Sequence, residues 1–106
     1  MDAVTAVSGS GPAYVFLLIE TLAQAGINAG LDADLANHLA LTTVGGAGAL
    51  AQTSPDTPSV LRENVTSPGG TTAAALDVLM AKSGLEQLKT KAVAAAKARG
   101  QELSNV

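Results

Sequence analysis

The stretch Ser67–Thr72 has the residue types and spacing that most suggest chemistry, because a proline and two glycines precede two threonines and an alanine-rich run. Adjacent glycines leave the backbone bare, and the residues after them begin a helix whose first N–H groups lack partners within the helix. Those donors, at the positive end of the helix dipole, suit a carboxylate or a phosphate. Ser67, Thr71 and Thr72 add hydroxyls that either cap the helix or donate to a ligand. The pattern therefore predicts an anion site, with ordinary helix capping as the alternative.

The composition describes the domain that must position this stretch. With 106 residues, we expect one domain spanning residues 1–106. Hydrophobic residues make up 47% of the chain, yet there is one Phe, one Tyr and no Trp, which predicts a core of Leu, Val, Ile and Ala. A small chain this apolar favours a partner subunit that covers the excess. The absence of Cys is compatible with the cytoplasm, and a single His predicts no metal site.

The charges argue against two classes of partner. A net charge of -3 is not that of a nucleic-acid-binding protein. We expect the solvated face of the last helix to carry the basic residues that follow position 80, which are Lys82, Lys89, Lys91, Lys97 and Arg99. No basic segment precedes an apolar one as in a signal peptide. Residues 35–55 lack charges but contain Asn, His, Thr and Gln, so we expect a buried helix there and no membrane partner.

The capping residues, prolines and glycines that separate the apolar runs predict helices throughout and no strand. The first expected helix runs from Pro12 to about Gly26 or Gly30, with Ser10 or Gly11 as its N-cap. The second is capped by Asp32 and ends near Leu50 or Gln52. Three more are expected, from Pro58 to about Asn64, from Thr71 to Lys82 and from Leu85 to Ser104. The run from Ala13 to Ile19 is apolar on every side, so we expect it to lie between its own domain and another subunit. Gly9 and Gly11 do not begin a dinucleotide fingerprint, because Tyr14 stands where the third glycine belongs and no strand pattern precedes them.

Two motifs resemble those of a known family. The segment from Pro58 to Thr72, continuing into Ala75, Leu76 and Leu79, resembles the signature of pyrroline-5-carboxylate reductases. Ser8 to Tyr14 resembles the start of the C-terminal domain of the same enzymes. The resemblance extends from Ala3 to about Leu103, and Met80 departs from it because the family commonly has a polar residue there.

The resemblance implies an all-α fold and a function. The fold would be a helical dimerisation domain like the C-terminal domain of 6-phosphogluconate dehydrogenase, intertwined with its twin in a homodimer that in some members assembles further into rings. The N-terminal Rossmann domain of the family, which binds NADPH or NADH, is absent from this chain. The implied reaction is reduction of 1-pyrroline-5-carboxylate to L-proline in cytoplasmic proline biosynthesis. This chain would supply the dimer interface and the substrate carboxylate site, bind no cofactor alone and be inactive alone.

The resemblance also assigns roles to residues of the anion site. The amides of Gly70, Thr71 and Thr72 suit the substrate carboxylate. Ser67 and Thr72 match family positions that hold the substrate, with the Thr72 hydroxyl near the ring nitrogen. A threonine hydroxyl is too weak an acid to donate a proton outright near neutral pH, so we expect Thr72 to orient the imine or relay a proton from water.

The resemblance places Asn64, Val65 and Thr66 near the nicotinamide of the cofactor. These three residues immediately precede the glycine turn.

Two other interpretations compete with this function. The chain could be a purely structural helical dimerisation module whose glycine turn is only a helix cap. It could also be the corresponding domain of a β-hydroxyacid dehydrogenase, but that class uses a lysine in the long first helix and this chain has none before Lys82.

Overall fold

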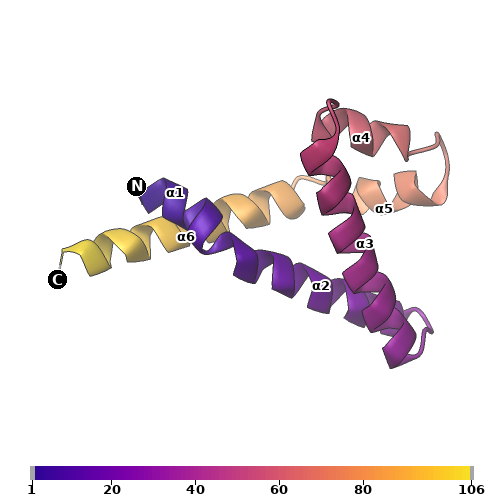
Figure 1. Ribbon diagram of the computed structural model, residues 1–106, viewed down its shortest axis with the longest axis horizontal. Coiled ribbons are helices and arrows are strands. Elements are labelled where there is room, and N and C mark those ends of the chain that lie inside the picture. Colours follow the sequence, from indigo (N-terminus) through magenta and orange to yellow (C-terminus); the bar gives the residue numbers. More distant parts are fainter. Residues whose placement is uncertain (1, 106) are drawn as a thin grey trace. The chain divides into compact units, whose positions relative to one another are not determined.

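The computed structural model describes residues 2–105, and Met1 and Val106 lie outside the described residues. Every regular element within residues 2–105 is a helix, which confirms the expected all-α class (Figure 1). The chain divides into two compact units, one formed by residues 12–61 and the other by the residues before and after them. The assignment of residues 1–106 to a single domain stays a prediction.

The unit of residues 12–61 consists of a pair of long helices and the beginning of α4 (Pro58–Asn64). It contains nearly all of α2 (Gly11–Asn28) and the whole of α3 (Ala33–Thr53). The Asp32 carboxylate accepts a hydrogen bond from the Leu35 N–H at 3.0 Å, so the predicted cap of α3 is confirmed. Gly26 allows the two helices to approach closely, because a Cβ on it would lie 3.4 Å from the Ala36 Cβ.

The other unit is organised around the C-terminal helix α6 (Leu85–Ser104), whose bounds match the prediction. The short helix α1 (Asp2–Val4) and the π-helix η1 (Thr5–Gly9) pack against α6, and Figure 1 shows them side by side. Ala6 of η1 is buried. The N-terminal residues therefore fix α6 in place within this unit.

The helical turns before Gly11 differ from the sequence prediction. Helix α2 begins at Gly11, next to the predicted N-cap at Ser10 or Gly11, but the segment before it, Asp2–Gly9, is itself helical. The Ser10 N–H donates to the Thr5 carbonyl at 2.9 Å, a bond to the fifth residue back that is typical of a π-turn. Pro12 has no N–H with which to continue a regular helix, so the register changes there without ending the helical backbone.

Two short helices precede α6. Helix α4 (Pro58–Asn64) begins where predicted, and the Thr57 hydroxyl accepts a hydrogen bond from the Val60 N–H at 3.2 Å. Helix α5 (Thr71–Leu79) begins where predicted but ends before Lys82. A tight turn between Leu79 and Leu85 replaces the last predicted turn of α5, so the expected C-terminal boundary is wrong.

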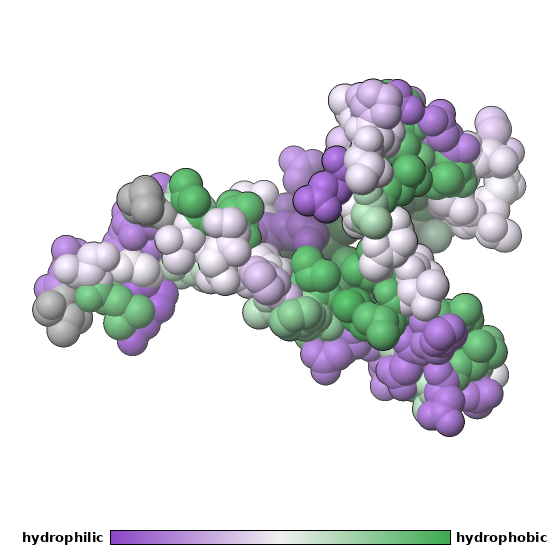
Figure 2. All heavy atoms as spheres, viewed as in Figure 1, coloured by the Kyte–Doolittle hydropathy of each residue, from purple (hydrophilic) through white to green (hydrophobic). Residues whose placement is uncertain are grey.

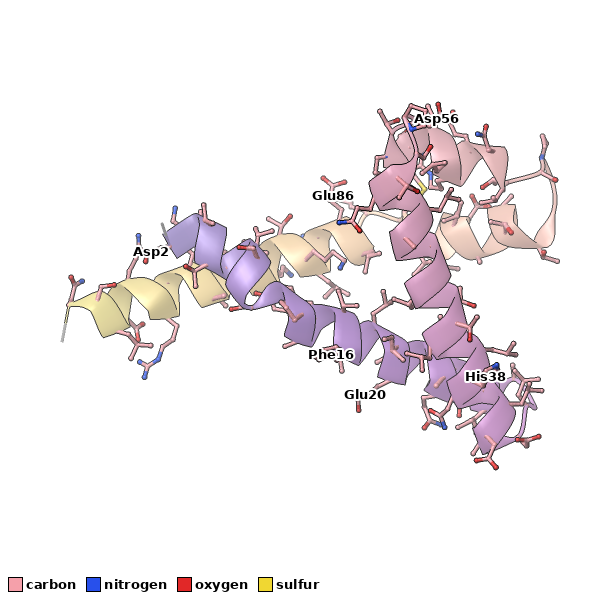
Figure 3. All side chains as sticks on the ribbon, viewed as in Figure 1. Asp2, Phe16, Glu20, His38, Asp56 and Glu86 are labelled. Carbon is pink, nitrogen blue, oxygen red and sulfur yellow. The ribbon has the colours of Figure 1, made fainter. Side chains whose placement is uncertain are left out.

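Of the expected core of Leu, Val, Ile and Ala, only the alanine part is buried within the described residues of this chain. The buried hydrophobic residues are all alanines, namely Ala6, Ala23, Ala36 and Ala40. Phe16 and Leu17 of α2 are 64% and 58% exposed, and Figure 2 shows apolar side chains at the molecular surface. Figure 3 shows Phe16 on α2 among other exposed side chains. Large exposed apolar surfaces of this kind are typical of protein interfaces.

One helical stretch, Asp2–Asn28, is long and apolar enough by length and composition to cross a membrane. The most apolar 18 residues of this stretch have a mean hydropathy of 1.3, and 6% of them are buried. It is a different stretch from residues 35–55, which the sequence analysis considered. A single helix of this kind is weak evidence for a membrane protein, because helices of soluble proteins pass the same test.

Candidate anion-binding site

A tight turn between α4 and α5 brings the predicted site residues together. The Gly70 N–H donates to the Ser67 carbonyl at 3.0 Å, and Gly69 has a φ of 72°. Proline followed by a glycine of positive φ is the pattern of a type II turn. A Cβ on Gly70 would lie 3.2 Å from the Ser67 carbonyl oxygen, a close contact. The two glycines therefore serve different purposes: Gly69 supplies the left-handed conformation, and Gly70 allows the close approach.

The N-terminus of α5 presents three backbone donors. The first hydrogen bond of the helix runs from the Ala74 N–H to the Gly70 carbonyl at 3.2 Å. Within residues 2–105, the N–H groups of Thr71, Thr72 and Ala73 have no hydrogen-bond acceptor. Together with the helix dipole, these three donors form a typical setting for an oxyanion.

One expected donor is already in use. We expected the amides of Gly70, Thr71 and Thr72 to face an anion, but the turn to Ser67 occupies the Gly70 N–H. The assignment of Gly70 to the substrate site stays a prediction, but its amide already has an acceptor, and Ala73 is the third free donor. The reason is that a β-turn bonds the N–H of its fourth residue, which a reading of the helix start alone does not reveal.

The hydroxyls around the turn do not cap α5. No side chain forms a hydrogen bond at its N-cap, Gly70. Ser67, Thr71 and Thr72 are exposed, and within the described part of the chain their hydroxyls make no hydrogen bond. Both the hydroxyls and the backbone donors of this turn are thus available to a ligand.

The residues expected near the nicotinamide lie at the end of α4. The Thr66 hydroxyl donates to the Arg62 carbonyl at 2.6 Å, which closes the end of the helix. Val65 is 70% exposed, and Asn64 is also exposed. These positions connect α4 directly to the anion-binding turn, but Thr66 has a local structural bond that the sequence did not predict.

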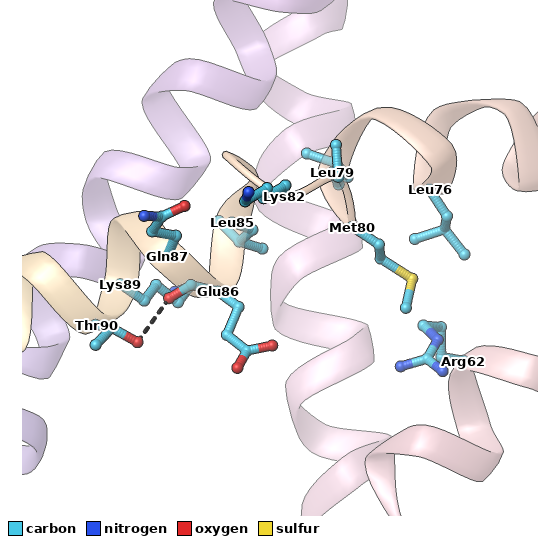
Figure 4. A pocket seen from close by; sticks show the side chains of 11 residues that line it. Arg62, Leu76, Leu79, Met80, Lys82, Leu85, Glu86, Gln87, Lys89 and Thr90 are labelled. Carbon is cyan, nitrogen blue, oxygen red and sulfur yellow. Dashed lines mark hydrogen bonds between the residues drawn. The ribbon is translucent and has the colours of Figure 1, made fainter.

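An open groove of about 720 Å³, which the sequence did not predict, lies along α5 and α6 (Figure 4). Its apolar lining includes Leu76, Leu79 and Leu85, and its cations are Arg62, Lys82 and Lys89. Figure 4 also shows the Thr90 hydroxyl donating to the Glu86 carbonyl, a bond of 2.9 Å within α6. The leucines that recur before and after the α5–α6 turn are the feature of the sequence from which this apolar groove could have been predicted. None of the residues from Asn64 to Thr72 lines this groove.

Curated proteins similar to this chain include several pyrroline-5-carboxylate reductases. The chain is 52% identical over 103 residues to the pyrroline-5-carboxylate reductase of Synechocystis, covering 97% of this chain and 38% of that protein. It is 50% identical over 103 residues to the pyrroline-5-carboxylate reductase of Pisum sativum, covering 97% of this chain and 37% of that protein. The chain thus spans a little over a third of the length of these relatives.

Solved structures and a family profile agree with these relatives. A pyrroline-5-carboxylate reductase from Coxiella burnetii matches 96% of this chain and 37% of its own chain, with 43% identity and a TM-score of 0.90. Plasmodium falciparum pyrroline carboxylate reductase, solved with NADP bound, matches 93% of this chain and 37% of its own, with 40% identity and a TM-score of 0.87. Residues 1–103 match the family described as pyrroline-5-carboxylate reductase dimerisation. The chain therefore belongs to the pyrroline-5-carboxylate reductase dimerisation family.

Proposed function

We propose that this chain is the dimerisation and substrate-binding part of a pyrroline-5-carboxylate reductase, which reduces 1-pyrroline-5-carboxylate to L-proline. The observation that carries this proposal is the set of three unpaired N–H groups on Thr71, Thr72 and Ala73. They lie at the start of α5 in a chain of the matching family. The substrate has a carboxylate, the group that such donors bind.

The residues of the turn bind and orient the substrate. The amides of Thr71, Thr72 and Ala73 hold its carboxylate, and the exposed hydroxyls of Ser67 and Thr72 contact the rest of the molecule. The Thr72 hydroxyl orients the ring nitrogen and relays a proton from water, because a threonine hydroxyl is too weak an acid to be the final donor. Binding in this fixed orientation lowers the entropic part of the activation barrier.

The nicotinamide cofactor is held by a part of the enzyme other than this chain. Among residues 2–105 there is no strand to begin a Rossmann unit, and the sequence has no dinucleotide fingerprint. NADPH or NADH supplies the hydride when bound, and the Plasmodium falciparum relative was solved with NADP. Val65, between Asn64 and Thr66, offers an exposed apolar side chain for contact with the nicotinamide. The chain alone is inactive because it lacks a nucleotide-binding fold.

The partner is a second copy of the chain. The family is named for dimerisation, and α2 exposes the large apolar side chains that a partner subunit would cover. An intertwined homodimer in the cytoplasm accounts for both observations, and rings of dimers extend the same assembly. The competing function, a dimerisation module without a ligand site, rests on the same exposed helix and differs only at the turn before α5.

A titration of the isotope-labelled chain with L-proline tests the ligand site. We expect the amide signals of Thr71, Thr72 and Ala73 to shift with proline and not with prolinamide, which lacks the carboxylate. If no amide signal shifts selectively at high proline concentration, or if both compounds cause equal shifts, the chain is the purely structural module instead.

Two alanine variants distinguish the contribution of the Thr72 hydroxyl to proline binding from that of the backbone amides. Thr72→Ala keeps the backbone donor but removes one hydroxyl hydrogen bond, so proline should bind about 5-fold more weakly. Thr53→Ala is the matched control, because its hydroxyl donates only within α3, to the carbonyls of Ala49 and Leu50. We expect it to leave the affinity for proline unchanged.

A further inference from the structure

The turn between α5 and α6 is closed by backbone hydrogen bonds on both sides. The Met80 N–H donates to the Leu76 carbonyl at 2.7 Å, which ends α5. The Gly84 N–H donates to the Ala81 carbonyl at 2.8 Å, and the Gly84 carbonyl accepts from the Leu88 N–H at 3.2 Å. Gly84 is therefore both the last residue of the turn and the N-cap of α6.

Gly84 packs directly against the backbone of this turn. A Cβ at this position would overlap with the Leu79 carbonyl oxygen and would lie 2.8 Å from that of Ala81. Its φ of -85° is available to any residue, so the requirement for glycine comes from the close approach and not from the backbone conformation. Because both obstacles are backbone atoms, a change of side-chain rotamer cannot relieve the overlap. Leu79, the last residue of α5, has to move away from α6.

The anion-binding turn lies at the other end of the same short helix. Helix α5 has nine residues, which corresponds to about 13.5 Å. Helix α6 is held independently by α1 and η1. A displacement at Leu79 is therefore transmitted along α5 to the amides of Thr71, Thr72 and Ala73, while α6 stays in place.

We propose that Gly84 is a positioning residue that sets the place of the anion-binding amides relative to α6, because without a side chain it lets the turn between α5 and α6 close against the carbonyls of Leu79 and Ala81. This inference rests on the proposed function, because the place of these amides matters only if they hold the substrate. Carbon and oxygen atoms in contact lie about 3.3 Å apart or more, so the new Cβ has to move away from the Ala81 oxygen by about 0.5 Å, and further from that of Leu79.

Crystal structures of the parent chain, Gly84→Ala and Gly100→Ala test the inference. After superposition on α6, we expect the Thr71–Ala73 amides of Gly84→Ala to move by about 0.5 Å or more. Gly100→Ala is the matched control within the same unit, because its new Cβ would meet only the Asp2 carboxylate oxygen at an ordinary 3.6 Å. Unmoved amides in Gly84→Ala, or the same movement in Gly100→Ala, would overturn the proposal.

A measurement on the parent chain covers the case in which Gly84→Ala does not fold. Residual dipolar couplings of α5 and α6 should fit a single alignment tensor, because the turn holds the two helices as one body. Separate tensors for the two helices would overturn the positioning role without any variant.

Kinetics and binding distinguish this inference from the proposed function. In the complete reductase, Gly84→Ala should lower kcat about 10-fold or more with little change in KM, since misplacement of a bound substrate by about 1 Å slows reactions up to 10²-fold. Proline should still shift the local amides of the variant, because the donors themselves are intact. Loss of the proline shifts in the parent chain would refute the proposed function, whereas an unchanged kcat in Gly84→Ala would refute the positioning role alone.

Discussion

At the scale of single residues, the site depends on backbone conformation more than on side-chain chemistry. Gly69 is one of two described glycines with positive φ, and it turns the chain so that α5 can begin at Thr71. Any residue with a Cβ is disfavoured in this conformation by about 1–2 kcal/mol. The turn at Gly69 thus sets where α5 starts, and the first three N–H groups of α5 lack acceptors as at any helix N-terminus.

Gly69→Ala should lower the free energy of unfolding by about 1–2 kcal/mol and weaken proline binding at the turn. Urea denaturation at a fixed chain concentration measures the first effect, because self-association also contributes to the measured stability. Gly100→Ala should change stability in the opposite direction, by up to about 1 kcal/mol, since alanine is favoured over glycine within a helix. Equal effects of the two substitutions would show that Gly69 does not adopt its left-handed conformation in solution.

At the scale of elements, helix α3 begins at a single side-chain contact. The Asp32 carboxylate accepts from the Leu35 N–H at 3.0 Å, and Asp34 lies in the first turn near the positive end of the dipole. The residues that α3 buries, Ala36 and Ala40, follow within two turns of this cap. The cap therefore sets the place at which α3 starts to pack against α2.

Asp32→Ala should lower the free energy of unfolding by about 1 kcal/mol, because the Leu35 N–H loses its acceptor. Asp32→Asn is the matched variant, since its side-chain oxygen still accepts the bond and only the charge is lost. Thermal unfolding of the three chains at one concentration measures the difference. If Asp32→Asn loses as much stability as Asp32→Ala, the effect comes from the charge at the helix start and not from the hydrogen bond.

At the scale of the whole molecule, the chain buries alanines and exposes its larger apolar side chains. Phe16 and Leu17 of α2 are mostly exposed, although they belong to the most apolar run of the sequence. A folded chain that leaves such residues in water gains stability when a partner covers them, because burial of each large apolar side chain contributes about 1.5–3 kcal/mol. Association and folding are then expected to be coupled.

Phe16→Glu should weaken self-association by about 100-fold or more, because a symmetric dimer loses the burial of two phenylalanines and has to bury two charges. Gln24→Glu adds the same charge to the same helix at a position that is already polar, and we expect it to associate like the parent chain. Sedimentation velocity across a concentration series measures both. A parent chain that is monomeric at micromolar concentration would contradict the homodimer.

The starts of α3, α4 and α6 could be predicted from the sequence because their causes are local. Asp32 supplies an acceptor three residues before Leu35, Pro58 fits the first turn of a helix, and Gly84 precedes a helical run. The family signature ending at Thr72 is equally local, so the candidate site could be found without coordinates. Such features depend on residues that are neighbours along the chain, so they can be predicted from the order of the residues alone.

Other features were decided only by the tertiary structure. The end of α5 at Leu79, three residues before the predicted Lys82, was not evident from the sequence. The sequence determined which residues are apolar, but only the packing of the helices decided that alanines are buried and that Phe16 stays exposed, because burial depends on contacts between segments that are distant in the sequence.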